Sequence, residues 1–233
     1  MKIKDAVVLV TGANRGLGQA FVHGLLAAGA KKIYAAARKP ESITLDGVEP
    51  IRLDVTKPGE ITAAVAIASD VNLLINNAGI SSPGALLSKG SLAAARAEFE
   101  TNFFGPLAMS TAFAPVLAAN GGGTIVNVLS VLSWISFPGA ATYSASKAAE
   151  WSLTNGLRHE LRSQGTKVMG VHVAFMDTDM TKGREVPKVD PNDVARLVLE
   201  ALETDQDEVL ADDLTRKVKQ GLSAGFYLAE PKR

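Results

Sequence analysis

Short, continuous apolar runs recur along the chain, and each one ends in polar or glycine-rich residues. The first run, Ala6–Val10, is followed by a glycine-rich turn and then by apolar residues at helical spacing (Phe21, Val22, Leu25 and Leu26). A continuous apolar run of this length is typical of a strand covered on both faces of a sheet, whereas apolar residues three or four apart predict an amphipathic helix. The chain therefore begins with a predicted strand, turn and helix.

The same alternation continues to the C-terminal region. Further strands are predicted at Lys32–Ala37, Pro50–Leu53, Asn72–Ile75, Thr124–Leu129, Lys167–Ala174 and Glu208–Ala211. Further helices are predicted at Pro58–Ala68, at Leu92–Leu117 with an interruption at Gly105-Pro106, through Tyr143 to Arg162, from Asp190-Pro191 onwards, and at Asp212–Leu222, where Leu214, Val218 and Leu222 form the apolar face. This order predicts an α/β fold, a Rossmann-like doubly wound parallel sheet of about seven strands with helices on both faces.

We expect a single domain over residues 1–233, with cofactor binding mainly in 1–125 and the catalytic and substrate segments in 126–233. The 24 basic residues balance 24 acidic ones, so no nucleic acid or anionic membrane is expected as a partner. The chain has no cysteine and only three dispersed histidines, so we expect no metal site. Met1 is followed almost at once by a strand, which leaves no room for a signal peptide and predicts a cytoplasmic protein.

The stretch Thr101–Ser146 contains no charged residue. Breaks at Gly105-Pro106, Pro115, Asn120–Gly123 and Phe137–Gly139 divide it into pieces shorter than a membrane span. We therefore expect the buried centre of the fold here.

The turn after the first strand reads Thr11-Gly-Ala-Asn-Arg-Gly-Leu-Gly18. A strand, a glycine turn and a helix in this order form an anion site, because backbone N–H groups at the helix N-terminus point at a phosphate that glycines allow to approach. An ordinary βα turn is the alternative for this loop considered alone. The second strand ends in Arg38 and carries no acid for a ribose 2′-hydroxyl, and Arg15 supplies a second cation. Either arginine alone would be solvated surface, but together they favour a 2′-phosphate, and hence NADP(H).

Two further features lie at strand ends or within the long central helix. The fourth strand runs into Asn76-Asn-Ala-Gly79, at the edge where parallel sheets bind ligands. Pro106 has no N–H, so the carbonyl of Asn102 loses its helical partner and could hold a water on a proton path. A simple kink is the alternative explanation.

Tyr143 and Lys147 lie four residues apart within T-Y-S-A-S-K, on one face of a predicted helix. A phenol with a pKa of about 10 exchanges protons poorly at neutral pH. A nearby ammonium group favours the phenolate and lowers that pKa toward the working range. The Y-x-x-x-K pattern alone is weak, because most such pairs are surface or core contacts.

Taken together, these motifs resemble those of the short-chain dehydrogenase/reductase family, in its single-domain members, over essentially the whole chain. The resemblance rests on five features in the family's order, which are Thr11-Gly-x-x-x-Gly-x-Gly18, Asn76–Gly79, Asn102, Ser130 thirteen residues before the tyrosine, and Tyr143-x-x-x-Lys147. It implies that Tyr143 is the general acid in reduction and the base in oxidation, and that Ser130 binds the carbonyl oxygen. It also implies that Lys147 binds the nicotinamide ribose and lowers the tyrosine pKa, while Asn102 holds a water linking Lys147 to solvent.

The resemblance also implies the cofactor contacts. Gly12, Asn14, Gly16, Leu17 and Gly18 would surround the pyrophosphate, Arg15 and Arg38 the 2′-phosphate, Asp54 and Val55 the adenine, Asn76, Ala78 and Gly79 the adenosine ribose side, and Thr178 the nicotinamide amide, with Tyr143 and Lys147 at the nicotinamide ribose. One departure is Val173-Ala174, where the family usually has Pro-Gly, although Thr178-Asp-Met180 matches. Ser133 lies close to Ser130 but lacks its spacing to the tyrosine.

The predicted function is an NADP(H)-dependent oxidoreductase of the carbonyl reductase or alcohol dehydrogenase type, acting on a small carbonyl or alcohol. One alternative is an inactive dinucleotide-sensing module, against which the intact tyrosine, lysine, serine and asparagine argue. An epimerase or dehydratase is a second alternative, for which too little chain follows Thr178. Trp134, Ile135, Phe137 and Met180 would line an apolar substrate pocket, or equally belong to the core or to an interface. A homodimer or homotetramer is expected through the helices around Phe103–Leu117 and Ala148–Leu157.

Overall fold

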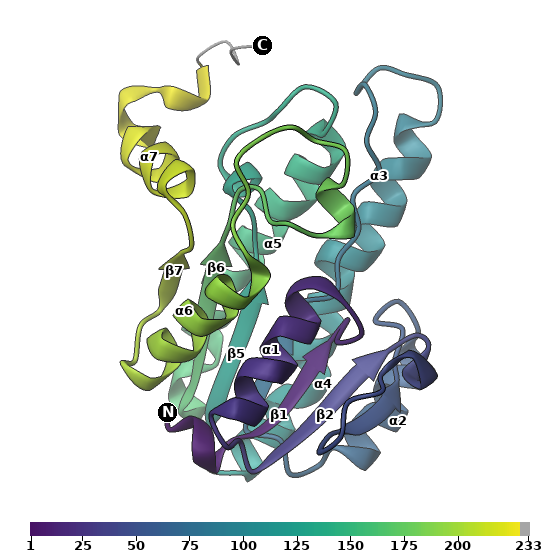
Figure 1. Cartoon of the computed structure of the whole chain (residues 1–233), viewed down its shortest axis with the longest axis vertical. Coiled ribbons are helices and arrows are strands. Elements are labelled where there is room, and N and C mark those ends of the chain that lie inside the picture. The colour runs from purple at the N-terminus through teal and green to yellow at the C-terminus, as the bar shows by residue number, and fades with distance from the viewer. Residues whose placement is uncertain (229–233) are drawn as a thin grey trace.

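The computed structural model describes residues 1–228, which form one seven-stranded sheet between layers of helices (Figure 1). The strands are β1 Val7–Thr11, β2 Lys32–Ala37, β3 Glu49–Arg52, β4 Leu73–Asn76, β5 Gly123–Val128, β6 Thr166–His172 and β7 Glu208–Leu210. They lie in the order β3-β2-β1-β4-β5-β6-β7, and every neighbouring pair is parallel. The predicted Rossmann-like, doubly wound sheet is confirmed; the last five residues of the predicted single domain lie outside the described part.

Successive strand residues point to opposite sides of the sheet, and both sides are apolar, so helices cover both faces. The helices are α1 Gly16–Ala27, α2 Pro58–Ile67, α3 Ser91–Phe99, α4 Gly105–Ala119, α5 Ala141–Glu160, α6 Pro191–Glu203 and α7 Asp213–Gly221. Val8 and Val10 of β1 pack into a core shared with α1 and α6, whereas Val7 and Leu9 pack into a second core shared with α2, α4 and α5 (Figure 1). The central strands therefore present apolar side chains to both faces, with polar exceptions such as Asn76 and Asn127.

The order of the strands reverses at β1, which pairs with β2 on one side and with β4 on the other. Connections that leave β1 and β4 run in opposite directions, which opens a crevice at the carboxyl ends of these strands. The glycine turn after β1, the Asn76–Gly79 segment after β4 and Ser130 after β5 all follow the strands at this edge. The fold thus gathers the polar motifs that are dispersed along the sequence.

The predicted interruption of the helix Leu92–Leu117 takes a different form in the structure. Helices α3 and α4 are joined without a break by a π-helical turn over Glu100–Phe104. The N–H of Gly105 donates to the carbonyl of Glu100, five residues earlier, and Pro106 has no N–H to continue the ordinary pattern. The helix widens at this point instead of breaking.

The prediction that Gly105-Pro106 divides the apolar stretch into pieces shorter than a membrane span is wrong. Ser91–Ala119 is one continuous helical stretch, which by length and composition alone is long and apolar enough to cross a membrane. Its apolar character has a place in the fold, since Met109, Phe113 and Leu117 are fully buried in the core beneath the sheet. The expectation of a buried centre holds for this face of the helix.

The C-terminal helices follow their predicted caps more closely than their predicted faces. Asp190 caps α6 by accepting a hydrogen bond from the N–H of Asn192, with a proline in the first turn as expected. In α7, however, Leu214 is 44% exposed, whereas Thr215 and Val218 are completely buried. Val218 of the predicted apolar face is therefore confirmed as buried, whereas Leu214 is not, and Thr215 packs in its place.

Candidate active site and cofactor crevice

The glycine turn lies pressed against the segment that follows β4. Gly12 and Gly16 have φ angles of +66° and +53°, which favour glycine because side chains rarely adopt them. A Cβ on Gly12 would lie 3.1 Å from the Cα of Ala78, and a Cβ on Gly18 would lie 2.1 Å from the carbonyl oxygen of Gly12. Helix α1 begins at Gly16, so the N–H groups of its first turn have no partner inside the helix. This geometry fits a phosphate at the end of α1.

Two residues that the sequence analysis did not single out fasten this turn. The hydroxyl of Thr11 accepts hydrogen bonds from the N–H groups of Asn77 (2.9 Å) and Ala78 (3.0 Å) and donates to the carbonyl of Ile75 (3.2 Å). The side-chain amide of Asn77 donates in return to the carbonyl oxygens of Thr11 (2.9 Å) and Gly12 (3.3 Å). Both belong to motifs named in the sequence analysis, but their hydrogen bonds depend on β1 and β4 being neighbours in the sheet.

Asn76 contributes less to the crevice than the sequence predicts. Its side chain is buried beneath the sheet and donates to the Oδ1 of Asn127 at 2.9 Å. Asn127 in turn donates to the hydroxyl of Thr154 on α5 at 2.9 Å. The side chain of Asn76 therefore ties β4, β5 and α5 together, and only its backbone can face a cofactor.

The predicted adenine contacts lie after β3. Asp54 accepts hydrogen bonds from the N–H (3.0 Å) and the hydroxyl (2.7 Å) of Thr56. Burial alone would raise the pKa of Asp54, but these bonds and the nearby charges of Arg38 and Lys57 hold that pKa below its ordinary value. Val55 is buried, and Arg38 at the end of β2 is exposed.

Arg15, the second predicted 2′-phosphate contact, forms an ion pair with an acid. Its Nη1 is 3.0 Å from the Oδ2 of Asp179, and both side chains are about two-thirds exposed. Exposed ion pairs contribute only about 0–1 kcal/mol, so a phosphate can compete for this guanidinium group. The ion pair places Arg15 next to the segment after β6.

That segment covers the glycine turn. A Cβ on Gly16 would lie 3.3 Å from the Cγ2 of Thr178, so Thr178 borders the start of α1. At the position where the family usually has Pro-Gly, the N–H of Ala174 donates to the Oδ2 of Asp212 at 2.8 Å. Asp212 also caps α7 through the N–H of Thr215 at 2.8 Å. The backbone leaving β6 is thereby anchored to α7.

Lys147 is buried on α5 next to the crevice. Its ammonium group donates to the carbonyl oxygen of Val128 at 2.7 Å and to the Oε2 of Glu150 at 2.6 Å. A Cβ on Gly79 would lie 3.8 Å from the same nitrogen. An ammonium group has three donors, so two are occupied by protein groups and the third remains for another acceptor.

Asn102 lies on the other side of Gly79, in the π-helical turn. Its Oδ1 accepts from the N–H of Ile80, and its Nδ2 donates to the carbonyl oxygen of Ile80, both at 2.9 Å. The Nδ2 also donates to the hydroxyl of Ser146 on α5 at 3.0 Å. A Cβ on Gly79 would lie 3.3 Å from the Oδ1 of Asn102, so Gly79 separates Asn102 from Lys147. Asn102 and Lys147 thus lie on either side of Gly79.

Ser130 is held at the start of a short 3-10 turn, Val131–Ser133. Its hydroxyl accepts from the N–H of Leu132 at 3.1 Å, and its own N–H donates to the hydroxyl of Ser133 at 3.3 Å. Its carbonyl oxygen is 3.2 Å from the Nδ1 of His172, which is completely buried. The hydroxyl of Ser133 therefore helps to hold the backbone of Ser130 in place.

The pKa of Tyr143 differs from the prediction made from the sequence. Burial raises this pKa most, and the ammonium group of Lys147 opposes that effect. The carboxylate of Glu150 raises it, a hydrogen bond with Ser130 lowers it, and the carboxylate of Glu98 raises it. The net direction is upward, so the predicted lowering by Lys147 is outweighed by burial and by two acids that the motif does not include.

These two acids are the main side chains missed by the sequence analysis. Glu98 on α3 is completely buried, and its Oε1 accepts from the N–H of Ser82 at 2.7 Å. Glu150 is 1% exposed and contacts Lys147, one helical turn earlier. Helical spacing to Asn102 and to Lys147 was the available signal, but solvated faces show the same spacing.

The predicted substrate-pocket residues have mixed environments. The ring of Trp134 stacks on that of His172, with centroids 3.9 Å apart, and meets Trp151 edge-on. Met180, by contrast, is 50% exposed beside the crevice. Trp134 is thus part of the packing behind Ser130.

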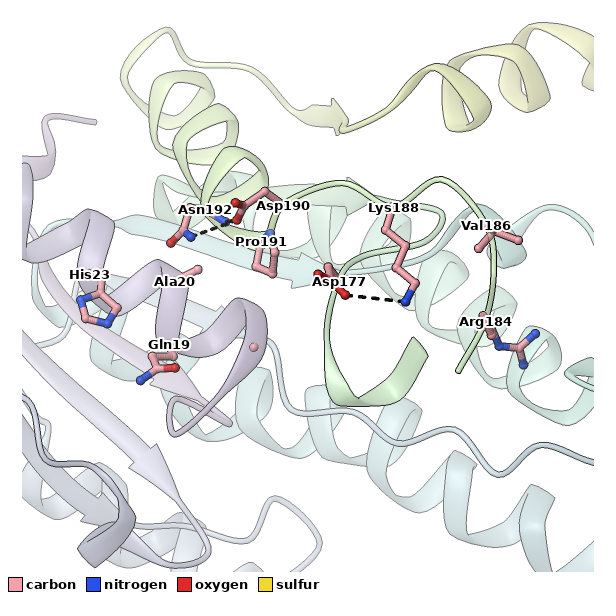
Figure 2. A pocket seen from close by; sticks show the side chains of 11 residues that line it. Gln19, Ala20, His23, Asp177, Arg184, Val186, Lys188, Asp190, Pro191 and Asn192 are labelled. Atoms are coloured by element: carbon pink, nitrogen blue, oxygen red, sulfur yellow. Dashed lines mark hydrogen bonds and ion pairs between the residues drawn. The ribbon is translucent and has the colours of Figure 1, made fainter. Parts of the chain in front are cut away.

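A separate cavity of about 770 Å³ lies between α1 and the segment 177–192 (Figure 2). Gln19 and His23 line it from α1, and the ion pair of Lys188 with Asp177 (3.6 Å) lies on the opposite side. Its lining includes Gly16 but neither Ser130 nor Tyr143. This cavity therefore borders the predicted phosphate site and not the tyrosine.

Comparison with known proteins agrees with this geometry. The family model for short chain dehydrogenases matches residues 6–188. A crystal structure of a short chain dehydrogenase from Burkholderia cenocepacia in complex with NADP is 39% identical, covers 99% of this chain and 100% of its own, and superposes with a TM-score of 0.93. A short chain dehydrogenase/reductase from Burkholderia phymatum in complex with NAD is 25% identical, covers 100% and 99% of the two chains, and has a TM-score of 0.89.

Two further proteins are also similar to this chain. An NADPH-bound carbonyl reductase from chicken fatty liver is 29% identical, with a TM-score of 0.79 over 88% of this chain and 96% of its own. An oxidoreductase of Staphylococcus saprophyticus is 33% identical over 71% of each chain. With this sheet, this crevice and these matches, the chain belongs to the short-chain dehydrogenase/reductase family of oxidoreductases.

Proposed function

We propose that this protein is an NADP(H)-dependent oxidoreductase that interconverts a carbonyl group and a secondary alcohol on a small molecule. The observation that carries this proposal is the convergence of Ser130, Tyr143 and Lys147 beside the glycine turn. The Nζ of Lys147 lies 6.0 Å from the centre of the Tyr143 ring, and Ser130 is close enough to lower the pKa of Tyr143. A proton donor, an oxygen-binding hydroxyl and a cation are thus grouped where a nicotinamide would lie.

A bound nicotinamide cofactor would supply or accept the hydride. In reduction, the Tyr143 hydroxyl would donate a proton to the carbonyl oxygen, which the Ser130 hydroxyl would bind by a second hydrogen bond. The Tyr143 hydroxyl is protonated below its raised pKa, and the ammonium group of Lys147 lowers that pKa against the effect of burial. The third donor of Lys147 would hold the nicotinamide ribose, and Asn102, across Gly79, would hold a water that links Lys147 to solvent.

We also propose a preference for the phosphorylated cofactor. Arg38 is exposed at the end of β2, a strand that ends without an acid, and Arg15 has only an exposed ion pair to give up. The relative from Burkholderia cenocepacia is bound to NADP, although the one from Burkholderia phymatum is bound to NAD. The absence of a competing carboxylate at the end of β2 is the feature of this chain that supports NADP(H).

The direct test is a panel of ketones, aldehydes and acyl thioesters incubated with the protein and either NADPH or NADH. We expect NADPH to be consumed with at least one member of the panel, and faster than NADH. Tight NADPH binding without turnover of any member would contradict the proposal and would indicate a dinucleotide-sensing module.

A further inference from the structure

A buried acid lies on the same helical stripe as the two residues of the Tyr-Lys motif. Tyr143, Lys147 and Glu150 are spaced by four and three residues, so their side chains share one face of α5. Glu150 is 1% exposed, and its Oε2 is 2.6 Å from the Lys147 nitrogen. Burial of a carboxylate is unfavourable unless it is paired, so the contact with Lys147 is what allows Glu150 to be buried here.

We propose that Glu150 is a positioning residue for the reaction: its carboxylate holds the Lys147 ammonium group and offsets the pull of that charge on the Tyr143 proton. This inference rests on the proposed function of Tyr143 as an acid and base. It assigns a role to a residue outside the motif that identifies the family.

The positioning part follows from the geometry around Lys147. A lysine side chain has a flexible four-carbon stem, and its ammonium group has three donors. Glu150 and the carbonyl oxygen of Val128 occupy two of them from the α5 and β5 sides. The remaining donor has Gly79 as its neighbour, where an added Cβ would be 3.8 Å away. Two anchors thus leave the third donor on the side of the crevice.

The electrostatic part follows from the charges that face Tyr143. On α5 these are Lys147 and Glu150, and α3 contributes Glu98. The β6 side contributes His172, whose pKa is lowered to about 3 chiefly by burial, so this ring is neutral. Burial raises the pKa of Glu150 to about 7 against the opposing effect of Lys147, so the carboxylate is ionised through the alkaline range in which a tyrosine titrates. With Glu150 ionised, the phenolate of Tyr143 is disfavoured.

The test compares Glu150→Gln with the wild-type protein. The amide keeps the shape and one acceptor for Lys147 but removes the negative charge. Glu160→Gln is the matched control, because Glu160 is exposed near the end of the same helix. We would measure the pH profile of kcat/KM for alcohol oxidation and, in the protein without cofactor, the ultraviolet absorbance of tyrosinate, with Tyr143→Phe as the reference for the other tyrosines.

In Glu150→Gln, Tyr143 should lose its proton at a lower pH in both measurements. Glu150 lies two helical turns from Tyr143, so the expected shift is about half a unit to one unit, less than the one to three units of a charge in contact. Glu160→Gln should match the wild type. A folded Glu150→Gln whose two profiles coincide with those of the wild type would overturn the proposal.

Glu150→Asp keeps the inference testable if the glutamine variant does not fold. The shorter carboxylate retains the charge but withdraws from Lys147, so the wild-type pH profile should persist while the Kd for NADPH rises about three- to tenfold, the range of one weakened hydrogen bond. An aspartate variant with wild-type kcat and Kd would refute the positioning role. The tyrosinate titration needs no substrate, so failure of every carbonyl in the panel would reject the proposed function without affecting this test.

Discussion

Replacement of Gly18 by alanine tests whether the glycine turn has the tight geometry that a phosphate site requires. The new Cβ would lie 2.1 Å from the carbonyl oxygen and 2.8 Å from the carbonyl carbon of Gly12, and 2.6 Å from the Nδ2 of Asn77. Two of these three atoms are backbone. Contacts below 3.0 Å require the neighbouring atoms to move, so either the turn or the start of α1 must shift.

Neither the glycine turn nor the start of α1 can shift without a loss of stability or of NADPH binding. Gly12 is already at φ +66°, and it packs closely against Ala78: a Cβ on Gly12 would lie 3.1 Å from the Cα of Ala78. Forcing extra volume into such packing typically costs about 1–3 kcal/mol of unfolding free energy. For a chain of this size, that corresponds to a drop in Tm of roughly 2–12 °C. Misplaced N–H groups at the start of α1 should also raise the Kd for NADPH at least about tenfold, equal to about 1.4 kcal/mol.

Thermal unfolding and fluorescence titration with NADPH measure these two effects. Gly59→Ala is the matched control, because Gly59 is an exposed helical residue with nothing within 4 Å of an added Cβ. That variant should keep the wild-type Kd and show an equal or slightly higher Tm. A Gly18→Ala protein with the Tm and Kd of the wild type would show that the turn is not tightly packed and would refute this reasoning.

Three other predictions address the cofactor, the assembly and the response to acid. Arg38→Asp should raise the KM for NADPH by an amount equivalent to roughly 1.5–3 kcal/mol, and equal kcat/KM with NADPH and NADH in the wild type would contradict the two-arginine argument. The protein should form a dimer or tetramer through the helices around Phe103–Leu117 and Ala148–Leu157. A monomer in sedimentation equilibrium at micromolar concentration would count against this assembly. Because burial lowers the pKa of His172 to about 3, below its ordinary value of 6.5, stability should be complete above about pH 6.5 and decline as the pH falls toward 3. Urea unfolding of His172→Gln should show a weaker decline over that interval, and an identical decline would exclude His172 as its source.

The sheet was predictable from the sequence because its central strands are apolar on both faces and are separated by helices and glycine turns. The meeting of the glycine turn, Gly79 and Ser130 followed from topology, since carboxyl ends of parallel strands share one edge. Lys147 and Asn102 both lie close to Gly79. Each of these inferences uses a local pattern and the rule that joins such patterns in a parallel sheet.

The remaining features depend on partners that are distant in the sequence. Asn76 and Asn127 bond to each other beneath the sheet, and nothing near either residue indicates that their side chains turn away from the crevice. Glu98 and Glu150 resemble surface residues of helices until the packing of α3 and α5 buries them. The upward shift of the Tyr143 pKa could not be predicted for the same reason, since it arises from burial and from these acids.

The central claim is that Tyr143 is the proton donor of a working active site, and its most direct test is turnover by Tyr143→Phe in parallel with NADPH binding. The variant should lose at least about 10²–10⁴-fold in kcat, the usual contribution of general acid catalysis, while its Kd for NADPH stays close to that of the wild type. Ser130→Ala, which removes one hydrogen bond to the developing oxyanion, should lose about 10²–10³-fold, and Lys147→Ala should impair both turnover and binding. A Tyr143→Phe protein that binds NADPH and keeps most of its turnover would contradict the claim.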